Sequence, residues 1–259
     1  MSETLSLTGL AIRGPNRLLV ENVSLSLAAG RVTALVGPSG SGKTLTARAL
    51  LGLVGFKPGV ISGTLEAGGA HLALTHATPQ DYRPLRGKLL GYLPQGARAS
   101  LDPLWTVERS VGASAALGSG PNDPSHWLRL SGFDDPEQVL RHFPHELSGG
   151  MAQRAALACA LAGGSRFLIA DEPTTGLDPT VQEGILRHLT RLKARGLGVL
   201  LITHDLRLLP ELADEVLVMA AGRIEERVTP EALVAGALRS EAGVRLLEAT
   251  RTIASGRLG

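Results

Sequence analysis

The sequence predicts an α/β protein in which short buried strands form a parallel sheet joined by helical crossovers. Three runs are short and almost wholly apolar: Val32–Val36, Phe167–Ala170 and Val199–Ile202. Such runs are typical of strands covered on both faces. Helix-like segments follow the first and the third run, over Thr44–Leu51 and Leu206–Leu212. Parallel strands need such crossovers, so the pattern favours a parallel sheet.

Two segments near the start of the chain predict a separate, antiparallel sheet. Residues 4–12 alternate between small polar and apolar side chains, and residues 18–27 (LLVENVSLSL) show a similar pattern. This period of two is typical of half-buried strands. Near the other end, Val216–Glu226 predicts a hairpin that turns at Gly222.

The middle of the chain predicts an inserted helical lobe over about residues 97–162. Residues 97–146 contain five prolines and four of the eight aromatic residues, and the following Met151–Leu161 segment is rich in alanine and predicted to be helical. Residues 230–259 are expected to form a short helical tail. We therefore interpret residues 1–259 as a single functional unit with an N-terminal β part, a central core and a helical insertion.

Composition excludes several classes of protein. The 259 residues carry a formal charge of +2 and include a single cysteine, Cys159. One cysteine excludes a disulfide framework, and a near-neutral charge gives no reason to expect a nucleic-acid partner. The sequence has no run of 18 apolar residues, and its first ten residues lack the features of a signal peptide. A cytoplasmic protein is expected.

The strongest motif is a phosphate-binding loop between the first apolar strand and its helix. It matches the pattern G-x-x-x-x-G-K-[ST]. Its glycines let backbone N–H groups point into one concavity, and the start of the helix adds positive electrostatic potential there. The lysine ammonium can bind the β- and γ-phosphates, and the final hydroxyl can bind Mg²⁺. The motif consists of Gly37, Pro38, Ser39, Gly40, Ser41, Gly42, Lys43 and Thr44.

Two carboxylates follow the second apolar strand, at Asp171 and Glu172. An apolar run before such a pair is common on its own and can simply be a strand that enters a charged loop. Together with a phosphate-binding loop it predicts a nucleotide site, because Asp171 can hold Mg²⁺ through water. Glu172 is then placed to orient and polarise the attacking water.

A third motif, Leu147-Ser-Gly-Gly-Met151, precedes the alanine-rich segment. Ser148 can cap that helix, while Gly149 and Gly150 leave N–H groups open for an anion. The alternative is a capped helix start without a ligand.

The order of these motifs over residues 5–228 resembles the ATP-binding cassette family, the nucleotide-binding domains of ABC transporters. That resemblance implies a P-loop NTPase (RecA-like) core that binds ATP and Mg²⁺. It implies that Gln95 in GYLPQ reaches Mg²⁺ and the attacking water and that Asp178 in TTGLD contacts an opposite subunit. It also implies that His204 in LITHD hydrogen-bonds the γ-phosphate.

The resemblance also implies partners. In this family the signature of one subunit faces the phosphate loop of another, so ATP binds between two chains, and hydrolysis lets the dimer open. We expect a second, different ATP-binding subunit, two membrane-spanning subunits and, indirectly, a solute-binding protein. The location would be the cytoplasmic face of the inner membrane. Exposed aromatics such as Trp105 and Trp127 are candidates for contacting the membrane subunits, with ordinary core packing as the alternative.

The signature reads LSGGM, with Met151 in place of the usual glutamine, and the surrounding residues resemble the peptide/nickel importer branch. Peptide members carry clustered cysteines and a P-x-H-P-Y-T motif in a C-terminal region. Here residues 240–247 lack both, which favours import of nickel or a metal–chelate complex. A di- or oligopeptide importer is the alternative. A non-transport cassette ATPase or a separately encoded exporter ATPase fits less well.

One expected feature is missing from the N-terminal sheet. The family usually stacks an aromatic side chain on adenine, and that side chain should fall near residues 12–17. The first 55 residues contain no aromatic side chain. Arg13, Pro15 or Arg17 could replace it, or stacking could be weak. We therefore predict poor discrimination between ATP and GTP.

Overall fold

The computed structural model describes residues 3–254, with side chains through residue 250. It confirms an α/β fold built on a six-stranded main sheet of order β10-β9-β3-β8-β7-β6. Neighbouring strands are parallel from β9 to β6, and only β10 is antiparallel to its neighbour. The strands are β3 (Val32–Val36), β6 (Leu90–Leu93), β7 (Phe167–Asp171), β8 (Gly198–Ile202), β9 (Glu215–Ala220) and β10 (Arg223–Val228).

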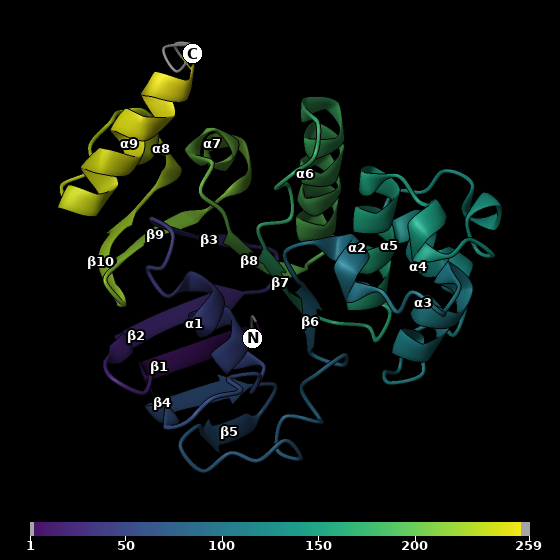
Figure 1. The fold of residues 1–259 in the computed structure, drawn as a ribbon, viewed down its shortest axis with the longest axis horizontal. Coiled ribbons are helices and arrows are strands. Elements are labelled where there is room, and N and C mark those ends of the chain that lie inside the picture. The colour runs from purple at the N-terminus through teal and green to yellow at the C-terminus, as the bar shows by residue number, and fades with distance from the viewer. Residues whose placement is uncertain (1–2, 255–259) are drawn as a thin grey trace.

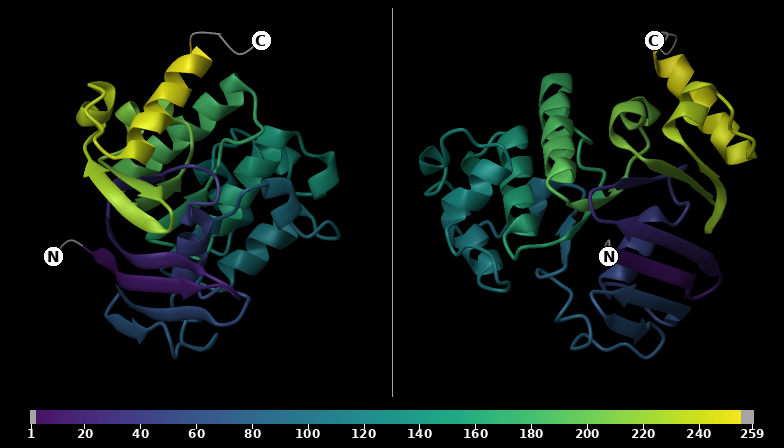
Figure 2. Two further views of the ribbon diagram at one scale, coloured as in Figure 1. Left: turned by 60° about the vertical axis from the view of Figure 1, so that its left-hand side comes forward. Right: turned by 180° about the vertical axis from the view of Figure 1, so that it is seen from behind.

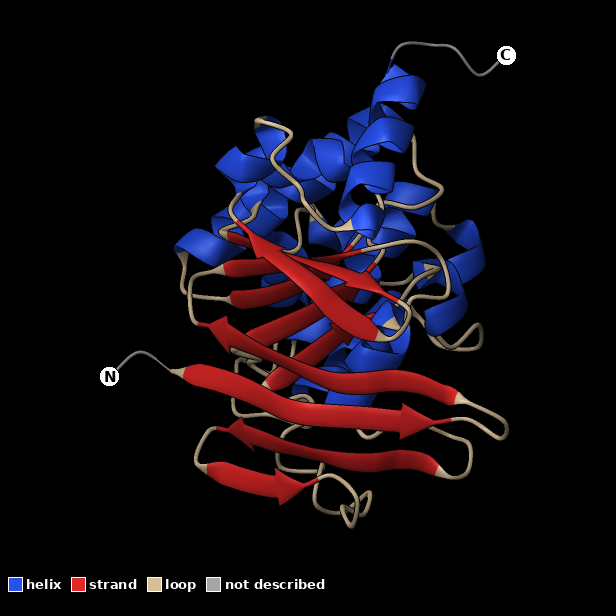
Figure 3. Cartoon of the chain, turned by 90° about the vertical axis from the view of Figure 1, so that its left-hand side faces the viewer, coloured by secondary structure: helices blue, strands red, loops and turns tan. Residues whose placement is uncertain are grey.

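A second, four-stranded sheet is antiparallel and has the order β2-β1-β4-β5 (Figure 3). Its first two strands, β1 (Thr4–Arg13) and β2 (Leu18–Ala28), lie where alternation predicts them. The sequence did not predict β4 (Gly59–Ala67) or β5 (Ala70–Ala73). Gly59 and Gly63 in β4, and Gly68 and Gly69 between β4 and β5, break the alternating pattern there.

Helices lie on both sides of the main sheet, and the insertion between β6 and β7 is helical, as predicted (Figure 1). The insertion and the C-terminal helices lie at opposite ends of the main sheet (Figure 2). No helix of residues 3–254 is both long and apolar enough to cross a membrane. Residues 255–259 of the expected tail lie outside the described residues. The helices are α1 (Lys43–Leu50), α2 (Ala97–Ser100), α3 (Val107–Ala115), α4 (Pro124–Leu130), α5 (Gly149–Leu161), α6 (Pro179–Ala194), α7 (Leu209–Leu212), α8 (Pro230–Val234) and α9 (Glu241–Ala254), with 3₁₀ turns at Pro136–Gln138, Pro144–Glu146 and Leu206–Leu208.

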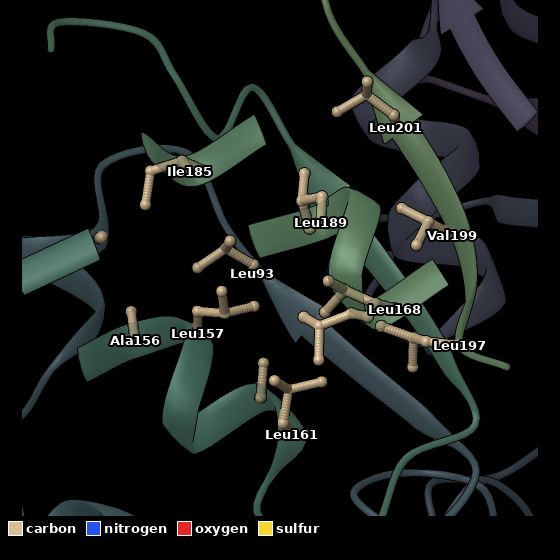
Figure 4. Close-up of a cluster of buried hydrophobic side chains, with 14 of the residues drawn as sticks. Leu93, Ala156, Leu157, Leu161, Leu168, Ile185, Leu189, Leu197, Val199 and Leu201 are labelled. Carbon is tan, nitrogen blue, oxygen red and sulfur yellow. The ribbon is translucent and has the colours of Figure 1, made fainter. Parts of the chain in front are cut away.

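The main sheet separates two apolar cores, because alternate side chains of each strand point to opposite faces. In β8, Val199 and Leu201 join the core beneath α5 and α6, whereas Leu200 and Ile202 join the core shared with the antiparallel sheet and α1. Leu157 of α5 and Leu189 of α6 meet the first of these faces (Figure 4). Both cores fix the ends of β3 and β7, which carry the motif residues.

One expectation needs correction, and another is confirmed. Trp127 is 5% exposed and packs inside the helical insertion, where its indole N–H donates to the carbonyl of Pro121 at 2.7 Å. Ordinary core packing therefore describes Trp127, whereas Trp105 is partly exposed, with the guanidinium of Arg109 over its ring. The predicted C-terminal hairpin is confirmed, because β9 and β10 pair antiparallel on either side of Gly222. Its first strand, β9, also pairs with β3 inside the main sheet.

Candidate nucleotide-binding site

The phosphate-binding motif forms the turn from β3 into α1, and glycine is required at its two ends. A Cβ atom on Gly37 would overlap the backbone carbonyl oxygen of Met219, and one on Gly42 would lie 2.7 Å from the Met219 Cε atom. Both glycines have positive φ angles, 155° and 109°. Gly40, also at positive φ, has open space around it. The loop therefore packs against β9 at Gly37 and Gly42 and leaves space around Gly40, where a phosphate group can bind.

The ammonium group of Lys43 lies inside this loop. It donates to the carbonyl oxygens of Gly37 at 2.8 Å and Pro38 at 2.9 Å, and lies 3.4 Å from the hydroxyl of Ser41. Burial lowers the pKa of Lys43, while the nearby carboxylates of Glu172 and Asp171 act in the opposite direction. An ammonium whose hydrogen bonds all go to neutral carbonyl and hydroxyl oxygens is suited to donate to phosphate oxygens instead.

The end of β7 brings a buried carboxylate to the first turn of α1. The hydroxyl of Thr44 donates to Asp171 Oδ1 at 3.2 Å, and the phenol of Tyr92 on β6 donates to Oδ2 at 3.4 Å. Burial raises the pKa of Asp171, and the Thr44 hydrogen bond opposes that shift. An oxygen pair of hydroxyl and carboxylate beside a phosphate loop is the donor set that Mg²⁺ prefers. Thr44 and Asp171 therefore fit the ion that the sequence predicts there.

Glu172 follows with a left-handed backbone, φ 49°, which is uncommon for a residue with a side chain. Its amide donates to the carbonyl of Ile202 on β8 at 2.9 Å, which fixes the turn to the sheet. Two donors reach its Oε2 atom: Gln95 Nε2 at 3.0 Å and Thr175 Oγ1 at 2.9 Å. Its Oε1 atom lies 3.5 Å from Nδ1 of His204.

The phosphate loop, Gln95, Glu172 and His204 line one cavity of about 480 Å³. Four chain segments far apart in sequence thus meet at one edge of the sheet. Leu19 of β2 also lines the cavity, and the sequence analysis missed it, although the alternation of residues 18–27 placed it on a strand. Residues 12–17 do not contribute to that lining. The full lining is Leu19, Gly37, Ser39, Gly40, Gly42, Lys43, Thr44, Leu45, Gln95, Glu172 and His204.

The signature residues lie apart from this cavity and form the start of α5. The hydroxyl of Ser148 accepts a hydrogen bond from the amide of Met151 at 3.2 Å, the capping contact that the sequence predicts. Gly150 is buried against α6, where a Cβ atom would lie 2.6 Å from Val181 Cγ1. Gly150 therefore has a packing role in addition to leaving an N–H group available.

Two further contacts involve motif segments, one within a helix start and one between segments. Asp178 caps α6 by accepting a hydrogen bond from the amide of Val181 at 3.0 Å. Arg98 of α2, three residues after Gln95, donates to the carbonyl of Leu147, the residue before Ser148. Neither Asp178 nor Ser148, Gly149 and Gly150 contributes to the cavity lining among the described residues. Within one chain these groups therefore do not meet the phosphate loop.

The fold and the cavity define this protein as a P-loop nucleoside triphosphatase. Residues 20–175 match the family model described as ABC transporter. The chain belongs to the ABC transporter family and is an ATP-binding, ATP-hydrolysing cassette of that family.

Curated relatives include ATP-binding proteins of nickel import and of peptide transport. The chain is 39% identical over 235 residues to a nickel import ATP-binding protein of Brucella abortus, an alignment that covers 87% of each chain. It is 36% identical over 214 residues to a dipeptide transport ATP-binding protein of Escherichia coli, covering 80% of this chain and 65% of that protein. The sequence resemblance to the nickel/peptide branch is thereby confirmed.

Solved structures agree on the fold. A dimeric ATP-binding cassette in a post-hydrolysis state, bound to ADP and Pi, superposes with a TM-score of 0.73 at 23% identity and covers 87% of this chain and 98% of that one. An ATP-binding subunit of an ABC transporter gives 0.74 at 24% identity, over 95% and 99% of the two chains. These similarities confirm the P-loop core with its antiparallel β part and helical insertion.

Proposed function

We propose that this chain uses ATP and Mg²⁺ to power an importer, with nickel or a metal–chelate complex as the transported substrate. The observation that carries the proposal is the meeting of Lys43, Gln95, Glu172 and His204 around one cavity. Nothing in that arrangement depends on the transported substrate, so the substrate assignment rests on relatives alone.

In the proposed mechanism each side chain has one task. Lys43 exchanges the loop carbonyls for phosphate oxygens and neutralises their charge. Thr44 and Asp171 would hold Mg²⁺, which would screen the charge of the phosphates. Gln95 would also reach the ion and the attacking water.

Glu172 orients that water and takes its proton, and His204 contacts the γ-phosphate side of the cavity. The two groups already lie within reach of one another, at 3.5 Å. In this proposal the triphosphate of ATP lies in the cavity, next to the segments that follow β3, β7 and β8.

The proposal includes a second ATP-binding subunit, a different chain, that closes the cavity. Ser148, Gly149 and Gly150 present a capped helix start that lies outside the cavity of their own chain. Asp178 is likewise exposed at the start of α6. Packing two chains head to tail would bring these groups over the partner's ATP. Two membrane-spanning subunits and an indirect solute-binding protein complete the importer, at the cytoplasmic face of the inner membrane.

A dipeptide or oligopeptide substrate is the second candidate, because peptide-transport relatives match at similar identity. Uptake of labelled nickel and of a labelled dipeptide should be measured in cells that carry the wild-type chain or Glu172→Gln. Loss of nickel uptake alone supports the first candidate, and loss of dipeptide uptake alone supports the second. Unchanged uptake of both would refute an importer for either substrate.

Assembly can be tested without knowing the substrate. The chain should be purified from its source with a tag and analysed for co-purifying membrane subunits and for a second ATP-binding chain. A complex with two different ATP-binding chains supports the heterodimer. A soluble homodimer without membrane subunits would contradict the proposed partners.

A further inference from the structure

Thr175 is a residue that the mechanism above does not use, yet it contacts the group on which hydrolysis depends. Its hydroxyl donates to Glu172 Oε2 at 2.9 Å, and its amide donates to the backbone carbonyl of Glu172 at 3.2 Å. Thr175 thus closes the turn that begins at Glu172, and it contacts both the backbone and the side chain of Glu172. Its other neighbours leave it exposed, so it is not a core packing residue.

We propose that Thr175 is a positioning residue that fixes the Glu172 carboxylate for attack by water. This inference rests on the proposed role of Glu172. Because the Thr175 hydroxyl occupies Oε2, the other oxygen, Oε1, is the one that lies beside His204. Both Glu172 and His204 line the cavity, so the oxygen that Thr175 leaves free, Oε1, lies on the side of His204 and the cavity.

Gln95 also donates to Oε2, but the two donors differ in how they are held. Gln95 lies between β6 and α2, at the start of the helical insertion. Its position therefore depends on where that insertion sits relative to the core. Thr175 lies three residues from Glu172 within the same turn, and the amide of Glu172 is tied to β8. Because Thr175 and Glu172 share one turn, the Thr175 hydroxyl stays beside the carboxylate wherever the insertion lies. It would therefore hold the carboxylate even if Gln95 bound Mg²⁺ instead.

The left-handed backbone of Glu172 makes such support necessary. A φ of 49° is sparsely populated by residues with side chains. A carboxylate on such a residue has several rotamers in water, and catalysis needs one of them. Hydrogen bonds to a charged acceptor are among the stronger ones, so one well-placed hydroxyl can select the rotamer.

The test compares Thr175→Val, which removes the hydroxyl at nearly constant shape, with Thr175→Ser, which keeps it. ATP hydrolysis is measured in the complete assembly as kcat and KM. We expect Thr175→Val to lower kcat about ten-fold with KM and ATP affinity unchanged, and Thr175→Ser to restore most of the rate. Thr190→Val is the matched control, since Thr190 is exposed on α6 and its hydroxyl donates only along its own helix, to Leu186.

The outcomes separate this inference from the proposed function. If Thr175→Val keeps kcat within two-fold of wild type, or if Thr175→Ser is as slow as Thr175→Val, the positioning role is wrong. If Glu172→Gln itself hydrolyses ATP at the normal rate, the proposed mechanism fails as a whole. Equal melting temperatures of the wild type and both Thr175 variants show that kcat reports the site and not the fold.

Discussion

The signature glycine Gly150 offers a sharp test of how α5 and α6 pack. Its ideal Cβ position lies 2.6 Å from Val181 Cγ1 and 3.2 Å from Cγ2. Atoms at ordinary contact need roughly 3.5–4 Å, so Gly150→Ala forces the two helices or the Val181 side chain to shift by about 1 Å. Overpacking of this kind costs about 1–3 kcal/mol.

The helix propensity of alanine opposes that cost. In an open helical position Gly→Ala stabilises by about 0.5–1 kcal/mol. We therefore expect a net loss of about 1–2 kcal/mol in the free energy of unfolding for Gly150→Ala. Gly149→Ala is the matched control, because the nearest atom to its Cβ would be Leu177 Cδ2 at 3.4 Å, close to ordinary contact. That variant should be neutral or slightly more stable than wild type.

The assay is chemical denaturation in the absence of nucleotide, because bound ATP would add its own stabilisation. The double variant Gly150→Ala/Val181→Ala relieves the clash, so its loss should be smaller than the sum of the two single losses by at least about 1 kcal/mol. Additive losses, or a Gly150→Ala variant at least as stable as wild type, would refute the packing role of Gly150.

Three further predictions concern nucleotide and proton binding. Lys43→Ala should lose ATP binding, measured by titration calorimetry, because the phosphates lose their buried cation; wild-type affinity would contradict this. ATP should be preferred over GTP by less than about 100-fold in competition binding, because the cavity offers Leu19 and no aromatic ring to the base; a larger preference would show an undetected base contact. Burial and nearby arginines, led by Arg154, lower the pKa of His188. The unfolded chain therefore binds a proton at His188 more readily than the folded chain does. The free energy of unfolding should fall as pH drops from 7.5 to 5.5. His188→Gln should lose less over that range in denaturation experiments, and an equal loss would contradict this reasoning.

The sequence predicted the parts of the fold whose pattern is local. The runs that became β3, β7 and β8 are continuous and apolar, so their burial could be predicted directly. The strand β4 contains Gly59 and Gly63, which break its alternation. The pairing of β9 with β3 joins residues about 180 positions apart, and no local pattern encodes such a contact.

In the candidate site, too, local motifs could be predicted and long-range contacts could not. The motif residues were found because a phosphate cradle and its carboxylates need particular residue types at fixed spacing. Tyr92 was missed because its partner, Asp171, lies 79 residues away. Thr175 was missed although it lies in the same motif as Glu172, since a hydroxyl three residues from a carboxylate is common in turns. The burial of Trp127 depends on how α4 packs on α5, which composition alone does not determine.

One measurement tests the central claim, that Glu172 activates water in a cavity built by Lys43 and its neighbours. ATP binding and hydrolysis should be measured on the same preparation of the assembled wild-type protein and of Glu172→Gln. The account predicts ATP affinity within a few-fold of wild type and hydrolysis at least about 100-fold slower, because binding uses the phosphate loop and turnover needs the base. Normal hydrolysis by Glu172→Gln would contradict the account.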